Sequence, residues 1–137
     1  GGHIIMTDKK NKTDKLDNLA ACDQLNQLSM AILVHAGNAR AHLVASLEAL
    51  EALAFQDAQA QLADAKREVV IAHGLQTDTL QMEASGNQIR YSTLFCHAQD
   101  TLMTAQSEIL IGEHMVRLFQ NLAENNIQKN TLESKED

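Results

Sequence analysis

The chain contains no proline, and aromatic residues make up only 3% of its 137 positions. Proline breaks the interior of a helix, whereas the aromatic and β-branched residues that suit a sheet are scarce here. Hydrophobic residues account for 45% of the chain, and many are Ala and Leu, which lose little conformational freedom in a helix. A chain of this length is typical of one domain with a buried core. The composition therefore predicts an all-α fold.

Three further absences narrow the possible functions. No Lys/Arg stripe is present and the formal net charge is −7, so nucleic acid is not expected as a partner. No apolar run approaches the roughly 20 residues that cross a bilayer, and no signal peptide opens the chain, so no direct membrane insertion is expected. Cys22 and Cys96 match no metal-ligand or redox spacing. We expect both to be small buried hydrophobic residues of a protein in a reducing cytoplasm.

The pattern of apolar residues predicts three helices between two polar ends. The helices are expected at about 17–54, 56–84 and 92–122, within a domain that spans residues 16–123. Short connections between them favour an antiparallel up-down-up bundle. Residues 1–15 and 124–137 are rich in Asn, Lys, Asp and Glu, and we expect them to be flexible tails. Residues 1–5 precede Met6, which we take as the native start, and are expected to be vector-derived.

Apolar residues at three- and four-residue spacing predict the inward face of the first two helices. Gly37 interrupts the first helix, and we interpret it as a point of close helix packing. Asp57 is the expected N-cap of the second helix, and Gly86 is expected to end that helix in the left-handed region. The inward positions predicted are Leu25, Leu28, Ile32, Ala36, Ala39, Leu43, Leu47, Leu50 and Leu53, then Ala58, Leu62, Ala65, Val69, Ala72 and Leu80.

The third helix carries apolar residues on two nearly opposite faces. A surface helix of a monomeric bundle is expected to have only one such face, and a large exposed apolar patch usually marks an interface. The sequence therefore predicts an oligomer built around this helix. We call one face the inner stripe: Ala98, Leu102, Ala105, Ile109, Gly112, Val116 and Phe119. We call the other the outer seam: Cys96, Asp100, Met103, Ser107, Leu110, Ile111, His114 and Leu118.

The most informative motif runs from Cys96 to Ala105 and places His97 and Asp100 three residues apart, on one helix face. From spacing alone, His97 reads as an interfacial hydrogen-bonding residue and Asp100 as an aspartate at a solvated edge of the outer seam. The longer string, His-Ala-Gln-Asp-Thr-Leu-Met at 97–103, resembles the signature of the lactose/cellobiose (N,N′-diacetylchitobiose)-type enzyme IIA of the bacterial sugar phosphotransferase system. The resemblance extends over about residues 22–122.

Two shorter elements also resemble this family. They are Gly-Asn-Ala-Arg at 37–40 and Glu-Ala-Ser-Gly at 83–86. One departure precedes the second helix, where relatives usually carry Gly-Asp before the phenylalanine matched by Phe55. This chain has Leu53 and Ala54 there, so the boundary between the first two helices is less well defined by the resemblance.

The resemblance implies that His97 carries a phosphoryl group, which imidazole suits because it is a good nucleophile when neutral. The donor would be phospho-HPr and the acceptor a cysteine of enzyme IIB, followed by a β-linked disaccharide of the lactose, cellobiose or chitobiose class that enters through membrane subunit IIC. Relatives often carry a second histidine where this chain has Thr101, whose hydroxyl can donate a hydrogen bond but supplies no positive charge. Gln99 is the other polar residue expected near the phosphoryl group.

The resemblance also implies a homotrimer with the third helices around a three-fold axis. Three copies of Asp100 brought together there would repel one another unless they shared protons or bound a cation. Carboxylate oxygens and water suit a hard divalent ion, so Mg²⁺ is the expected structural metal. No organic cofactor is expected.

A different class of function stays open. A non-catalytic helical adaptor, or a regulatory IIA-like paralogue, would keep the helical bundle but would not transfer a phosphoryl group. The presence of both His97 and Asp100 argues against it, while Thr101 leaves it open. Structural roles are predicted for the other histidines: His3, His35, His42, His73 and His114.

Overall fold

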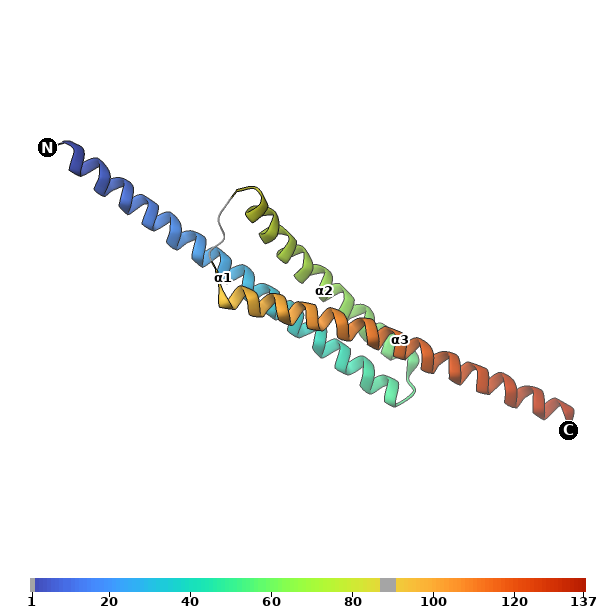
Figure 1. Ribbon diagram of the computed structural model, residues 1–137. Coiled ribbons are helices and arrows are strands. Elements are labelled where there is room, and N and C mark those ends of the chain that lie inside the picture. Colours follow the sequence, from blue (N-terminus) through green and yellow to red (C-terminus); the bar gives the residue numbers. More distant parts are fainter. Residues whose placement is uncertain (1, 87–90) are drawn as a thin grey trace.

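Three long helices make up the fold in a computed structural model that describes residues 2–86 and 91–137 (Figure 1). They are α1 (Gly2–Glu51), α2 (Phe55–Ala84) and α3 (Thr93–Glu136). The chain turns back sharply between α1 and α2, and α3 lies alongside the later part of α1. The prediction of an all-α fold with three helices is confirmed.

The core lies where the three helices overlap, and small side chains let the helices approach closely. Leu25, Ile32, Phe95 and Leu102 are the larger members of one buried cluster that draws on all three helices. Two further clusters continue the core toward the turn between α1 and α2. Seven alanines of the core are fully buried: Ala36, Ala39, Ala58, Ala65, Ala72, Ala98 and Ala105. The three/four spacing therefore identified the inward faces.

Three residues that we expected on inward faces are exposed. Leu80 and Phe119 are each 44% exposed, and Leu53 is 64% exposed. Leu80 follows Thr79, which is fully buried, so the inward face of α2 passes through Thr79 and Leu80 lies to one side of it. Phe119 lies three residues beyond Val116, the last buried residue of α3. Leu53 lies in the turn that follows α1, outside the helical spacing.

At both ends of the chain the helices run further than the sequence predicted. α1 already begins at Gly2, and α3 continues to Glu136. The two extensions project beyond the bundle at opposite ends of the molecule (Figure 1), and every residue from 6 to 21 and from 124 to 137 is exposed. With no proline or glycine in either described extension after residue 2, nothing in the sequence stops the i to i−4 hydrogen-bond ladder.

The turn between α1 and α2 has the hydrogen bonds of a Schellman motif. The backbone N–H of Leu53 donates to the carbonyl of Leu50 (2.9 Å), and that of Ala54 donates to Ala49 (2.9 Å). Leu53 therefore occupies the left-handed position, with φ of 58°. Ala54 is the N-cap of α2 and makes no side-chain cap, while Asp57, expected at the N-cap, lies in the first helical turn.

Leu53→Gly should stabilise the protein, because a left-handed conformation costs an L-residue about 1–2 kcal/mol and glycine much less. We expect the free energy of unfolding to rise by about 1 kcal/mol, measured by urea denaturation. Leu53→Ala is the control, since it shortens an exposed side chain but keeps the Cβ atom. Equal effects of the two substitutions would contradict a strained backbone at this position.

Close helix packing occurs at Gly112 and not at Gly37. Gly37 is exposed, and a Cβ atom added there would meet no atom within 4 Å. At Gly112 the added atom would lie 2.7 Å from Cδ1 of Leu43, which is buried. The contact between α1 and α3 therefore depends on the glycine of the inner stripe, and the expectation for Gly37 is wrong.

The end of α2 and the start of α3 lie where the sequence predicted them. Gly86 follows the last turn of α2 with φ of 100°, in the left-handed region where glycine is favoured. Ser92 is the N-cap of α3, and its side chain accepts a hydrogen bond from the backbone N–H of Phe95 at 3.1 Å. This cap fixes where α3 begins and hence the position of the motif in its second turn.

Candidate functional site

His97 lies on the surface near the start of α3, held by buried neighbours on either side in the sequence. Phe95 and Ala98 are both buried in the cluster that includes Leu25 of α1. These contacts fix the first turns of α3 against the bundle, whereas the side chain of His97 is exposed. The helix therefore presents an imidazole to solvent on a rigid backbone.

Thr101 is one turn along α3 from His97, and its hydroxyl is already engaged. Its Oγ1 donates to the backbone carbonyl of His97 at 2.8 Å. To donate to a phosphoryl oxygen on His97, the hydroxyl would first have to leave this carbonyl. Gln99 is half-buried and lies two residues from His97, so within one chain the two side chains point to different sides of the helix. Participation of Gln99 and Thr101 at a phosphoryl group stays a prediction.

Asp100 is exposed and belongs to the outer seam, as the spacing places it. Among the described residues its carboxylate makes no ion pair and no hydrogen bond with His97. Its backbone carbonyl accepts a hydrogen bond from Oγ1 of Thr104 at 2.8 Å. The carboxylate is thus exposed on the face of α3 that points away from the core.

The outer seam is an exposed apolar band on the isolated chain. Its large apolar residues are Met103, Leu110, Ile111 and Leu118, with 54%, 58%, 62% and 55% of their surface exposed. Asp100, Ser107 and His114 are also exposed, and Cys96 is half-buried. The opposite side of the same helix carries the inner stripe, which is buried from Ala98 to Val116. α3 therefore has one face in the bundle and a second apolar face that no other described part of the chain, within 2–86 and 91–137, covers.

A second exposed apolar band, which the sequence analysis missed, lies on α1. We call it the α1 outer stripe: Met30, Val34, Gly37, Ala41 and Val44, all exposed, at four- and three-residue spacing. The spacing was visible in the sequence, but the inward face of α1 has the same period, and only the packing distinguishes the two.

An ion pair between α1 and α3 separates the two exposed bands. Nε and Nη2 of Arg40 donate to the two carboxylate oxygens of Glu108, both at 2.9 Å. Arg40 neighbours Gly37 and Val44 on one face of α1, and Glu108 neighbours Ile111 on α3. The α1 outer stripe and the outer seam consequently lie on either side of this pair. Arg40 belongs to the Gly-Asn-Ala-Arg element.

Polar contacts on the other side of the bundle join α2 to its neighbours. Nδ1 of His35 lies 2.5 Å from Oε2 of Glu68, and this contact holds the pKa of the Glu68 carboxyl below its usual value. Nδ1 of His42 lies 2.8 Å from Oε1 of Gln61. The structural role predicted for these two histidines agrees with their positions between α1 and α2. His73 and His114 are exposed, and the side chain of His3 lies outside the described residues.

Glu113 makes a similar polar contact between α2 and α3. Its carboxylate accepts a hydrogen bond from Nζ of Lys66 at 2.5 Å, which lowers the pKa of the Glu113 carboxyl. Arg117, one turn further along α3, lies 3.4 Å from the same oxygen. Glu113 therefore joins α3 to α2 and is only partly exposed to solvent.

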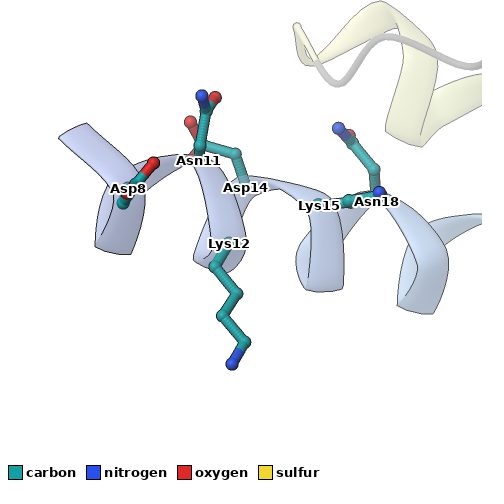
Figure 2. Close-up of a pocket in the computed structure, with 6 residues that line it drawn as sticks. All are labelled: Asp8, Asn11, Lys12, Asp14, Lys15 and Asn18. Atoms are coloured by element: carbon teal, nitrogen blue, oxygen red, sulfur yellow. The ribbon is translucent and has the colours of Figure 1, made fainter.

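Figure 2 shows an open hollow on the N-terminal extension of α1, far in sequence from the motif. It is lined by Asp8, Asn11, Lys12, Asp14, Lys15 and Asn18. All six residues are exposed and come from one helix, and none of the predicted site residues lies there. This hollow brings together no chemistry beyond mixed surface charge.

Two features are absent from the described parts of the chain, 2–86 and 91–137. No helix there is long and apolar enough to span a membrane. No three His, Cys, Asp or Glu side chains of a single chain gather there in a group that could hold a metal ion.

Comparison with known proteins gives a consistent result. Residues 27–120 match the family described as PTS system, Lactose/Cellobiose specific IIA subunit. The lactose-specific EIIA component of Lacticaseibacillus casei is 32% identical over 106 residues, which cover 77% of this chain and 95% of that protein.

Solved structures of similar proteins share the fold. The crystal structure of PtcA from S. mutans superposes with a TM-score of 0.70 at 32% identity, covering 72% of this chain and 96% of that one. The cellobiose-specific enzyme IIA from Bacillus anthracis gives a TM-score of 0.68 at 28% identity, covering 72% and 90%.

Proposed function

Because the chain belongs to the lactose/cellobiose-specific IIA family of the phosphotransferase system, we propose that it is a cytoplasmic phosphocarrier whose phosphorylated residue is His97. The observation that carries the proposal is the exposed imidazole of His97 on a capped, buried turn of α3, within the His-Ala-Gln-Asp-Thr-Leu-Met string. An exposed side chain on a fixed backbone is what a relay between two protein partners needs, because both must reach the same atom.

Two transfer steps are proposed. In the first, an unprotonated ring nitrogen of His97 attacks the phosphorus atom of phosphohistidine in HPr, so that one P–N bond forms as another breaks. In the second, the thiolate of a cysteine in enzyme IIB attacks the same phosphorus atom, a P–S bond forms and the imidazole leaves. Enzyme IIB then serves a membrane subunit IIC that imports a β-linked disaccharide of the lactose, cellobiose or chitobiose class.

Assembly into a homotrimer of up-down-up bundles is part of the proposal. The outer seam leaves four large apolar side chains about half exposed or more, and burying them against copies of itself would remove that surface from water. A three-fold ring also needs two different surfaces on each subunit, because its contacts run head to tail. The outer seam and the α1 outer stripe, on either side of the Arg40–Glu108 pair, supply two such surfaces.

A divalent cation at the axis is proposed for the same assembly. Asp100 offers a carboxylate without an ion-pair partner among the described residues, and it lies on the outer seam where symmetry would gather three copies. Oxygen ligands of this kind suit Mg²⁺, which would neutralise the repulsion among the carboxylates. In this proposal Asp100 acts in assembly, and His97 needs no base from it.

Phosphorylation separates this function from a non-catalytic adaptor. Incubation of the full chain with phosphoenolpyruvate, enzyme I and HPr should add one acid-labile phosphate per chain, and His97→Ala should abolish it. His73→Ala is the matched control, because His73 is also an exposed histidine but lies on α2. Unchanged phosphate uptake by His97→Ala, or none by the wild-type chain with active donors, would refute the proposal.

A further inference from the structure

His114 is the one histidine of the outer seam, and neither the proposed phosphoryl transfer nor the proposed metal site at Asp100 uses it. Its imidazole is exposed, and within residues 2–86 and 91–137 it makes no hydrogen bond or ion pair. No contact among the described residues therefore accounts for the structural role that the sequence predicted for His114.

The position of His114 along α3 matches that of Asp100. The two residues are 14 positions apart, which is two full heptads, so helices that pack around a common axis bring both back to it. At 100° per residue, Asp100 and His114 each lie about 160° around the helix from Ala98 of the inner stripe. They fall on opposite sides of the line that points directly away from Ala98. His114 is thus as central on the outer seam as Asp100, about 21 Å further along the helix.

In the proposed trimer, the apolar neighbours of His114 would shield its three copies from bulk water. Leu110 and Leu118 lie one turn before and one turn after it on the outer seam, and both are more than half exposed in the isolated chain. The adjacent charged residues are directed elsewhere, since Glu113 bonds to Lys66 of α2 and Arg117 lies against Glu113. Three imidazoles between two rings of leucine would have no polar partner except one another, water or a metal ion.

We propose that three copies of His114 form a second axial site, which takes a borderline transition-metal cation such as Zn²⁺. This inference rests on the proposed trimer. Three neutral imidazole nitrogens and one water complete the tetrahedral shell that Zn²⁺ prefers, whereas Mg²⁺ prefers oxygen ligands. The two layers would therefore select different ions: a hard cation at Asp100 and a softer one at His114.

The test is titration of metal-free full-length protein with ZnCl₂ by isothermal calorimetry, with the mass measured by sedimentation in the same buffer. The expected result is a site for one Zn²⁺ per three chains, weakened at least about tenfold by His114→Asn. His73→Asn and Asp100→Asn should retain it. His114→Leu should also lose the site while keeping the trimer through apolar packing, which separates loss of a ligand from loss of assembly.

The outcomes distinguish this inference from the proposal beneath it. A trimer whose Zn²⁺ binding is unchanged in both His114→Asn and His114→Leu would overturn the second site alone. Binding that disappears in Asp100→Asn but persists in the His114 variants would assign the metal to the carboxylate layer and overturn it as well. A monomer, with or without ZnCl₂, would overturn both the trimer and the site.

Discussion

Leu110→Asp is expected to convert the trimer into a monomer. Leu110 is 58% exposed in the isolated chain and lies on the outer seam between Ser107 and His114, so a carboxylate there would be taken out of water three times in one assembly. Burial of an unpaired charge costs several kcal/mol per ion, more than the loss of one apolar contact. Because the side chain points away from the core of its own chain, the three-helix fold should survive.

Sedimentation equilibrium measures this change directly. The wild-type protein should give about three times the chain mass of 15.1 kDa, and Leu110→Asp should give the chain mass itself at micromolar concentration. Val70→Asp is the matched control, since Val70 is 72% exposed on α2, away from the outer seam. An intact trimer in Leu110→Asp would show that the outer seam is not the interface.

Asp100→Leu should have the opposite effect on assembly, with a loss of metal dependence. The substitution removes three like charges from the axis. Replacing buried ionic groups by apolar ones of similar size is often neutral, or stabilising by about 1–4 kcal/mol. We expect the variant trimer to melt at the same temperature or higher, with no response to a chelator, while the wild-type trimer becomes less stable when Mg²⁺ is removed.

The same variant tests whether Asp100 has a role in the chemistry. Phosphate uptake from phospho-HPr should persist in Asp100→Leu, because the structure contains no hydrogen bond between Asp100 and His97 within the described residues. Loss of phosphorylation in a variant that is still trimeric and folded would make Asp100 catalytic and would contradict an assembly role.

The sequence predicted the inward faces of the helices well, because burial in a helical bundle follows the 3.6-residue period. Ile32, Ala72 and Leu102 are buried where that period places them. The ends of the helices were less predictable. A helix continues past its neighbours where no proline or glycine ends it. The polar composition of both ends suggested disorder, but the backbone hydrogen bonds of α1 and α3 continue through them.

Tertiary contacts explain the local errors. A glycine in a helix indicates a possible close approach but does not identify its partner, so Gly37 was assigned the role that Gly112 has opposite Leu43. Leu53 was assigned to the inward face of α1 because it continues the apolar spacing, yet the Schellman turn places it outside the helix with a positive φ. For the candidate site, spacing identified the outer seam, while the roles of His97 and Asp100 came from the resemblance, since one chain leaves both side chains exposed.

The most direct test of the central claim is to locate the phosphoryl group on the intact chain. After phosphorylation by phospho-HPr and rapid digestion at alkaline pH, where phosphohistidine persists, mass spectrometry should find one modified peptide. We expect this peptide to contain residues 97–103 and its fragmentation to assign the phosphate to His97. Phosphate on His73, His114 or any residue other than His97 would contradict it.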